Sequence, residues 1–407
     1  MAEEVVLPIP NLELPQAHFV LTQPTLGHLH SGALKSLLEG ITKDDMAPYY
    51  RALITVYQQT PTSPIAPTSP TIASRQFQIP MPEDKTLLEK MEKANKEELD
   101  KLDERLAEAE KTEGEMEIAD ALRARANYLT RIGDKDRSIA AQELAFEKTP
   151  GVGSKIDIVL TLVRIGFFFG DHSIISKNLT RAEELIEKGG DWDRRNRLKV
   201  YQGLHSLSIR QFKRACDLFV DALSTFTATE LLSYNDFVSL TMITSTLTMS
   251  RPDLKKKIIS APEVIQVLHE LPILNELTKS LYDCHYNKLF IALAKLEETQ
   301  LIPSRILNPH ARYYVRELRI LAYTQLLESY RSLTLESLAT AFGVSVAFVD
   351  ADLARFIASR RLNCTIDRVH GVVETNRPST KNTQYETVVR QGDLLLNSVQ
   401  KLSKVLY

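Results

Sequence analysis

The stretch that decides the fold of the second half of the chain is SLTLESLATAFGVSVAFVDADLARFIASRRLNCTIDRVHGVVET, residues 332–375. Its first part predicts two helices. One opens at Ser332-Leu333-Thr334 and ends at Gly343, and the other runs from Ser345 to Leu362. Just before the stretch, Tyr313–Tyr330 carries apolar residues at helical spacing, which predicts a third, amphipathic helix.

The end of the stretch holds two short runs that are rich in β-forming residues, Cys364–Asp367 and Val372–Thr375. His370-Gly371 lies between the two runs and Pro378 follows them, so we expect them to pair as a hairpin. Three helices followed by a hairpin is the order of elements in a winged helix, which we place at residues 309–378.

Residues 118–308 repeat a pattern of helix, turn and helix. Ile132-Gly133-Asp134, Phe169-Gly170-Asp171 and Leu207-Ser208-Ile209 each separate two helical patterns, at steps of 37 and 38 residues. Weaker echoes lie near Arg251-Pro252 and Tyr282-Asp283. This period is close to that of tetratricopeptide (TPR) repeats. We therefore expect a mostly α protein: an α-solenoid of TPR-like helix pairs, followed by the winged helix and a C-terminal helix.

The N-terminal region has three parts of different composition. Residues 1–57 are expected to form a helical segment that includes a short helix at Met46–Tyr57. Residues 58–82 are rich in Pro, Thr and Ser, and the prolines of Thr60–Pro70 favour an extended linker or insertion. Residues 83–117 hold 14 acidic and 7 basic residues, which predicts one charged helix. Such a helix is usually a solvated face, and an acidic docking surface is the alternative.

The last helix is expected at residues 382–407. Five apolar side chains and one glycine recur there at alternating spacings of four and three residues and form a heptad seam. The seam residues are Val388, Gly392, Leu395, Val399, Leu402 and Leu406. Burying these side chains returns less free energy than ordering about twenty residues costs, so the helix alone would be marginal. We therefore expect it to pack against partner helices.

Composition excludes several classes of protein. The 407 residues include 50 Lys and Arg against 52 Asp and Glu, so the chain lacks the basic excess typical of nucleic-acid-binding proteins. No apolar run approaches the ~18 residues of a membrane span, and the acidic start Met1–Glu4 is unlike a secretory signal. The three cysteines lie far apart, which offers neither a disulfide framework nor a zinc knuckle. We expect a soluble protein of a reducing compartment.

Two motifs resemble chemical sites but lack residues that such sites need. His28-Leu29-His30 has no third metal ligand at a suitable spacing. Gly151–Lys155 is similar to a phosphate-binding loop, but its order is Ser-Lys and a helical pattern precedes it. The nine histidines are scattered, and no pairing of a nucleophile with a base can be argued. We therefore expect no metal, no cofactor and no enzyme activity.

The segment 191–199 holds the only tryptophan of the sequence, Trp192. It also holds a cluster of four cations, Arg194, Arg195, Arg197 and Lys199. One interpretation is a helix start capped by Asp193, with the cations laid over an acidic groove of the neighbouring repeat. The other interpretation is a charged contact to another subunit. The two are compatible, and both stay open at this point.

The third helix of the winged helix carries Arg355, Arg360 and Arg361, which are suited to phosphate contacts. It also carries Asp350 and Asp352, so the helix lacks the one-sided basic face of duplex-binding proteins. We expect this winged helix to contact protein rather than nucleic acid.

Several stretches carry a resemblance to a known family: Met46–Tyr50, Arg131–Lys135, residues 189–203, Gln325–Leu335, Thr375–Pro378 and Gly392–Asn397. A helical-repeat array that runs into a winged helix resembles the PCI proteins of the proteasome lid, the COP9 signalosome and translation initiation factor three. Within this group, the chain is identified as a member of the family of non-ATPase regulatory subunit six of the 26S proteasome lid. The PCI domain would then comprise the last repeats and the winged helix, at about residues 200–378.

The resemblance implies a non-catalytic scaffold of the regulatory particle, acting in lid assembly and in ATP-dependent degradation of ubiquitinated proteins in cytoplasm and nucleus. Members of the family set their winged helices side by side and send their C-terminal helices into a shared bundle. The implied partners are other PCI lid subunits and the lid deubiquitinase module, in a hetero-oligomer without nucleic acid. Contact with the ATPase ring is left open. The alternative is a PCI scaffold of the signalosome or of an RNA-associated initiation or export complex.

The resemblance also assigns two sets of partner-binding residues. The winged-helix set comprises the two predicted strands, Cys364, Thr365, Ile366, Asp367, Val372, Val373, Glu374 and Thr375. The C-terminal set comprises the helical seam residues Val388, Leu395, Val399, Leu402 and Leu406. An open hairpin edge suits the addition of a strand by a neighbour.

Overall fold

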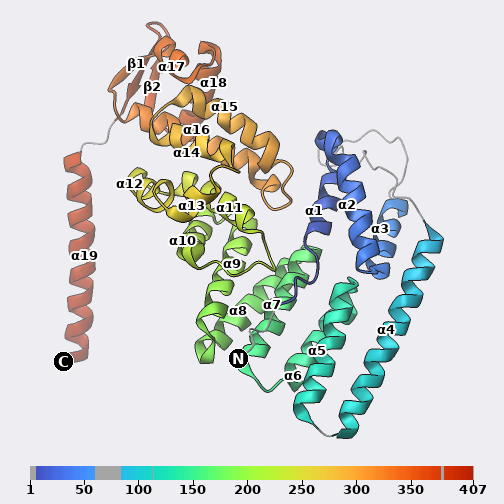
Figure 1. Ribbon diagram of the computed structural model, residues 1–407. Coiled ribbons are helices and arrows are strands. Elements are labelled where there is room, and N and C mark those ends of the chain that lie inside the picture. The colour runs from blue at the N-terminus through green and yellow to red at the C-terminus, as the bar shows by residue number, and fades with distance from the viewer. Residues whose placement is uncertain (1–5, 60–83, 113, 377–379, 407) are drawn as a thin grey trace. The chain divides into compact units, whose positions relative to one another are not determined.

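The computed structural model describes residues 6–59, 84–112, 114–376 and 380–406 (Figure 1). The predicted proline-rich linker therefore lies outside the described residues from residue 60 onward. The chain divides into two compact units. The first comprises Met1–Tyr282 and Ala292–Val315, and the second comprises Asp283–Ile291 and Arg316–Tyr407.

The N-terminal part of the first unit is helical. Its elements are α1 (Glu13–Thr22), the 3₁₀ helix η1 (Pro24–Leu29), α2 (His30–Lys43), α3 (Ala47–Gln59) and α4 (Lys85–Thr112). The predicted helix at 46–57 is confirmed as α3. The predicted charged helix at 83–117 is wrong in length, because α4 ends at Thr112 and α5 begins at Glu115. Gly114 is the N-cap of α5 and has the extended backbone that is typical of N-cap residues.

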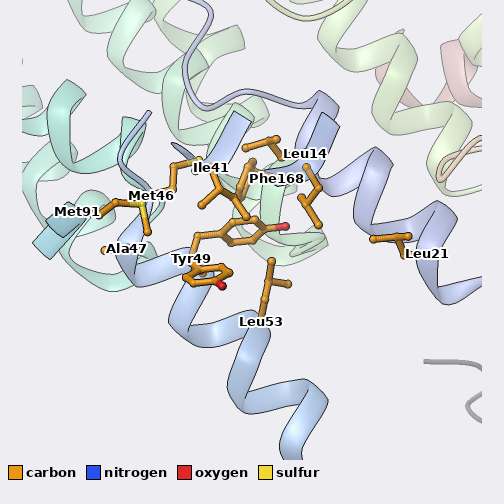
Figure 2. Close-up of a cluster of buried hydrophobic side chains, with 11 residues drawn as sticks. Leu14, Leu21, Ile41, Met46, Ala47, Tyr49, Leu53, Met91 and Phe168 are labelled. Atoms are coloured by element: carbon orange, nitrogen blue, oxygen red, sulfur yellow. The ribbon is translucent and has the colours of Figure 1, made fainter. Parts of the chain in front are cut away.

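A cluster of buried side chains joins these N-terminal helices to the array that follows them (Figure 2). Leu14, Ile41 and Leu53 come from three successive helices, and Met91 comes from α4. The ring of Tyr49 meets that of Phe168 edge-on, at a centroid distance of 4.8 Å. Since Phe168 belongs to α7, the N-terminal helices share a core with the repeat array.

The repeat array begins with antiparallel helix pairs. Its long helices are α5 (Glu115–Arg131), α6 (Lys135–Lys148), α7 (Val152–Phe169), α8 (His172–Gly189), α9 (Trp192–Ser208), α10 (Phe212–Ala222) and α11 (Tyr234–Thr248). Shorter elements complete it: η3 (Leu223–Thr225), α12 (Arg251–Leu254), the π-helical η4 (Lys255–Ile259), α13 (Pro262–Val267), α14 (Pro272–Tyr282), α15 (Tyr286–Leu296), the π-helical η5 (Glu297–Leu301) and η6 (Asn308–His310).

The predicted turns of the array are confirmed, and their chemistry explains them. Gly133 and Gly170 have positive φ values of 76° and 72°, the left-handed conformation that glycine favours after a helix. The aspartate that follows each glycine caps the next helix: Asp134 accepts from the Arg137 N–H, and Asp171 accepts from two backbone N–H groups. Each Gly-Asp pair therefore ends one helix and begins the next.

Ion pairs connect one helix pair to the following one. Lys135 at the start of α6 pairs with Asp171 at 3.0 Å, and Arg181 of α8 pairs with Glu143 of α6 at 2.7 Å. Arg181 also lies over the ring of Phe146. Each of these ion pairs joins residues about one period apart in the sequence, which is the nearest-neighbour packing expected of a solenoid. The expected α-solenoid is confirmed.

The close contact of α9 with α10 depends on Gly203, and this leads to a first prediction. A Cβ atom at Gly203 would lie 2.5 Å from the ring of Phe219. We expect Gly203→Ala to lower the free energy of unfolding by about 1–3 kcal/mol, because the added methyl group overpacks the interface. Urea denaturation followed by circular dichroism measures this change.

Gly189→Ala is the matched control, since a Cβ atom at that helical position meets nothing within 4 Å. Its expected effect is neutral or stabilising by up to ~1 kcal/mol. Equal destabilisation by the two variants would contradict the role assigned to Gly203.

The second unit contains the winged helix. Its elements are α16 (Ala311–Leu327), β1 (Ser332–Thr334), α17 (Leu335–Phe342), α18 (Val346–Ala358), β2 (Cys364–Asp367) and β3 (Val372–Thr375). The strands form an antiparallel sheet in the order β1-β3-β2. Phe342 lies at the centre of this unit, with its ring 4.6 Å from that of Tyr323 and 4.9 Å from those of Tyr286 and Phe290.

One prediction about this unit is wrong: residues 332–334 form a strand and do not open the second helix. Leu333 pairs with Val373 of β3, and Thr334 has an extended backbone. The side chain of Thr334 accepts a hydrogen bond from the Ser337 N–H, so Thr334 both ends β1 and caps α17. The end of this helix at Gly343, with φ of 67°, is as predicted.

No helix in the described ranges is long and apolar enough to cross a membrane.

Candidate functional site

The C-terminal helix α19 (Thr380–Leu406) presents its apolar side chains to solvent. The expected seam is exposed at Val388, Leu395, Val399 and Leu402, with 67% of Leu395 accessible. The side chain of Leu406 lies outside the described residues. None of the side chains described in this helix is buried. Leaving such a row of leucine and valine in water is unfavourable, so the helix is built to be covered.

The exposed apolar surface of α19 is wider than the heptad seam. Four further exposed apolar residues of α19 lie outside the predicted seam: Tyr385, Val389, Leu394 and Leu396. Val389 and Leu396 each follow a seam residue by one position, and they are seven residues apart. They therefore extend the seam sideways along its length. The run Leu394-Leu395-Leu396 was the signal in the sequence, because a strict two-residue seam would place only one of the three at the contact.

The eight predicted strand residues are brought together in one sheet, but in unequal positions. β3 is the central strand, since Val373 pairs with both Leu333 of β1 and Ile366 of β2. Val372–Thr375 therefore has no free edge for strand addition, and the expected contact of its side chains with a partner stays a prediction. The third strand was missed because residues 332–334 were assigned to a helix.

The edge open to a neighbour is that of β2. Hydrogen-bonded pairs alternate along an antiparallel ladder, and the Asn376 N–H donates to the Asn363 carbonyl at 2.9 Å. By this alternation Thr365 bonds to β3, while Cys364 and Ile366 direct their N–H and carbonyl groups outward. β1 is less suited to pairing, because it has three residues and its last one caps α17.

The turn between β2 and β3 is held by a side-chain cap. Asp367 accepts hydrogen bonds from the N–H groups of Val369 and His370, and its other oxygen lies 2.6 Å from His370 Nδ1. The hydrogen bond to His370 is the main cause that lowers the pKa of Asp367 below its ordinary value. Arg368 pairs with Asp350 of α18 at 3.0 Å, which fixes the hairpin against that helix. The β2 edge is therefore presented on a rigid support.

Cys364 is buried within the sheet, and burial raises the pKa of its thiol. A protonated, covered thiol is a poor nucleophile. Cys364 therefore contributes to β2 through the packing of its side chain and through its backbone groups.

The third helix of the winged helix is shorter than predicted, because α18 ends at Ala358 and Arg360 and Arg361 lie beyond it. Two of the three predicted phosphate-contact arginines pair with carboxylates of the winged helix. Arg361 pairs with Glu317, and Arg355 lies 3.9 Å from Asp352. Asp352 is buried and also accepts a 2.9 Å bond from Arg319 of α16. Two of the three arginines proposed for phosphate contact thus have carboxylate partners, which agrees with the preference for protein contact.

The segment around Trp192 divides between an internal and an exposed role. Arg194 binds both carboxylate oxygens of Asp157 on α7, at 3.0 and 2.6 Å, and this pairing raises the pKa of Arg194. Arg197 pairs with Asp193 one turn earlier at 2.9 Å. Trp192 is 64% exposed, and Arg195 is exposed beside it.

The predicted cap of this helix is corrected. Asp191 is the N-cap residue, and Asp193 lies inside the first turn. There its negative charge interacts favourably with the positive end of the helix dipole. The expected contact of the cations with the neighbouring repeat is made by Arg194 through Asp157. Trp192 and Arg195 are exposed, and the expected contact of this segment with another subunit stays a prediction.

The two motifs that resemble chemical sites have structural roles. His30 is buried, and its Nε2 lies 2.9 Å from the Gln23 carbonyl. No group of three or more potential metal ligands occurs in the part of the chain that the structure describes. Residues 151–155 begin helix α7, and the Lys155 ammonium lies over the ring of Phe146.

Comparisons with known proteins agree with this architecture. The family described as 26S proteasome subunit RPN7 matches residues 84–257, and the PCI domain matches residues 274–377. The C-terminal helix of 26S proteasome regulatory subunit RPN7/PSMD6 matches residues 384–406.

Similar curated proteins cover nearly the whole chain. The 26S proteasome non-ATPase regulatory subunit 6 homolog of Arabidopsis thaliana is 44% identical over 98% of this chain and 97% of its own length. The chain belongs to the RPN7 family of 26S proteasome regulatory subunits. Two fungal members, rpn7 of Schizosaccharomyces pombe and RPN7 of Saccharomyces cerevisiae, are 42% and 41% identical over 97% of this chain. They are covered over 95% and 92% of their own lengths. The resemblance given by the sequence is confirmed.

The RPN7 family assignment places both candidate surfaces within recognised modules. β2 and β3 lie inside the PCI match, and all the exposed seam residues of α19 lie inside the C-terminal helix match. The C-terminal helix thus has its own family description, and none of its described side chains is buried.

Proposed function

We propose that this chain is a non-catalytic scaffold subunit of the 26S proteasome regulatory particle lid, needed for lid assembly and for ATP-dependent degradation of ubiquitinated proteins. The observation that carries the proposal is the uncovered apolar face of α19, in a chain of the RPN7 family. An apolar face of this length is covered when similar helices from other subunits pack beside it.

In this proposal the winged helix supplies a second, ordered contact. A neighbouring PCI subunit pairs with the open edge of β2, where Cys364 and Ile366 offer backbone groups. The side chains of Thr365 and Asp367 are exposed at this strand and set which neighbour fits. Trp192 and Arg195 form a third, smaller contact with another subunit.

The proposed partners are other PCI lid subunits and the lid deubiquitinase module, held together through a bundle of C-terminal helices. The protein then works in the cytoplasm and the nucleus as part of a hetero-oligomer. It contributes surfaces, while partner subunits contribute catalysis.

The experiment that tests the proposal is site-specific photo-crosslinking of the affinity-tagged full-length chain in cells. Crosslinkers at Thr365 on β2 and at Val399 on the α19 seam are expected to capture other lid subunits. A crosslinker at Asn397, on the opposite face of α19, is the matched control and captures fewer. Native mass spectrometry of the purified material is expected to show a multi-subunit particle. Recovery of the uncrosslinked chain alone from both positions would contradict the proposal.

A further inference from the structure

Two histidine side chains meet where the helix pair α7–α8 packs against the helix pair α9–α10. His172 is the first residue of α8, and His205 lies in the last turn of α9. Because α8 and α9 are consecutive helices that pack side by side (Figure 1), these two positions lie at the same end of the array. The ring centroids of His172 and His205 are 6.0 Å apart, with an angle of 46° between the ring planes. The two imidazoles therefore sit together at the joint between successive helix pairs.

A permanent positive charge lies beside the two histidines. Arg214 is the third residue of α10, which packs against α9, and it is exposed. His205 is half-buried, whereas His172 is exposed. Burial is the main cause that lowers the pKa of His205 below its ordinary value of 6.5, and the positive charges of His172 and Arg214 lower it further. The folded chain therefore favours the neutral form of His205.

No carboxylate balances these groups in the part of the chain that the structure describes. The side chains of His172, His205 and Arg214 form no ion pair and no hydrogen bond with a described residue. Asp171 directly precedes His172, but its carboxylate binds the Lys135 ammonium at 3.0 Å and caps α8. Protonation of the histidines therefore adds positive charge that nothing nearby neutralises by direct contact.

The other charged groups on the packed helices do not change this balance. Tyr201, one turn earlier than the histidine on α9, donates its hydroxyl to buried Glu230 at 3.1 Å. Arg210, in the turn between α9 and α10, donates to Nδ1 of His310 at 3.2 Å. Asp217, one turn later than the arginine on α10, is exposed and forms no ion pair with a described residue. The nearest acidic groups are thus engaged elsewhere or lie in solvent.

The direction of the pH dependence follows from these contacts. In the unfolded chain a histidine has its ordinary pKa of 6.5, and in the folded chain the pKa of His205 is lower. The opened state therefore binds more protons than the closed state, so the stability of the joint falls as the pH falls below about 6.5. When both histidines are protonated, three positive charges gather at one half-buried joint.

We infer that the junction of α8, α9 and α10 at His172, His205 and Arg214 is an acid-sensitive joint of the repeat array. At neutral pH the joint is closed. On acidification the histidines gain protons and repel each other and Arg214, and the ends of α8 and α9 separate locally. The inference goes beyond the proposed assembly function, because it concerns the isolated chain and holds whichever subunits surround it.

The test uses the purified full-length protein. Histidines labelled with carbon-13 at Cε1 are titrated by NMR, and the resonance of His205 is the one that is lost in His205→Gln. Hydrogen exchange at about pH 7.5 and about pH 5.5, corrected for the intrinsic exchange rate, measures local opening. We expect a pKa below 6.5 for His205. We also expect several-fold faster corrected exchange at residues 171–175 and 203–214 at the lower pH.

Three variants separate charge from packing. His205→Gln is expected to lose most of the acid-induced acceleration, since glutamine stays neutral. Arg214→Gln keeps both histidines, and we expect it to raise the pKa of His205 toward 6.5 and to reduce the acceleration. A merely structural role of Arg214 would leave that pKa unchanged. His269→Gln is the matched control, because His269 is exposed elsewhere in the first unit, and this variant is expected to keep the full acceleration.

Two results would overturn the inference. One is a pKa of His205 at or above 6.5 in the folded wild-type chain. The other is equal acid-induced acceleration in wild type and in His205→Gln. If His205→Gln does not fold, Arg214→Gln decides, because Arg214 is exposed and its replacement leaves the packing intact. Acceleration equal to that of wild type in Arg214→Gln would then overturn the inference.

Discussion

The substitution of Leu395 and Leu402 by aspartate in one chain is expected to abolish incorporation into the lid while the isolated protein keeps its stability. Both side chains are exposed in α19, so the charges cost nothing until a partner helix covers them. Burial of two unpaired carboxylates in an apolar bundle costs several kcal/mol, which is enough to prevent association. Deletion of residues 383–407 is expected to have the same effect. Native mass spectrometry of affinity-purified particles measures incorporation, and the Tm of the purified chain measures stability.

The control for this prediction lies on the other side of the same helix. Asn397→Asp with Lys404→Asp adds at least as much negative charge, away from the seam. This variant is expected to enter the particle. A large fall in the Tm of the Leu395→Asp, Leu402→Asp chain would mean that the seam packs within the chain. Normal incorporation of the truncated chain into the lid would contradict the proposal that α19 packs in a helical bundle with other subunits.

The second large effect is expected at the centre of the winged helix. Phe342 is 1% exposed and packs against Tyr286, Phe290 and Tyr323. Phe342→Ala removes most of that contact and is expected to destabilise the second unit by about 3–5 kcal/mol. Hydrogen exchange read by mass spectrometry should show faster exchange at residues 332–375 and unchanged exchange at residues 115–222.

Phe348→Ala is the comparison for this substitution, because Phe348 is an aromatic residue of α18 that is 40% exposed. We expect its effect to be below about 1.5 kcal/mol. Uniform loss of protection along the chain after Phe342→Ala would show that the two units unfold together.

The parts of the fold that the sequence predicts well are those that depend on neighbouring residues. The Gly-Asp pairs at 133–134 and 170–171 combine a left-handed helix end with a cap, and both signals act within a few residues. The order of the helices in the winged helix and the heptad seam of α19 also follow from residues that are close in the sequence. Relatives that share about two-fifths of the sequence then confirm the family.

What the sequence does not predict depends on residues far apart in the chain. β1 has three residues, and its pairing of Leu333 with Val373 spans forty positions. Once that pairing is missed, β3 is taken for an edge strand. The hydrogen bond from Arg164 to the Leu7 carbonyl spans 157 positions, and no pattern near Arg164 in the sequence predicts it. Among the candidate contact residues, Arg194 is engaged internally because Asp157 lies one repeat away.

The strand order β1-β3-β2 gives the sheet a polarity. One flank terminates in a helix cap, and the opposite flank keeps unpaired backbone groups at alternate residues. A neighbour that adds a strand is therefore expected on the β2 side, since β1 is the less suited edge. In the proposed assembly, a subunit would receive its neighbour's strand at β2 and not at β1, so its two flanks would meet different neighbours.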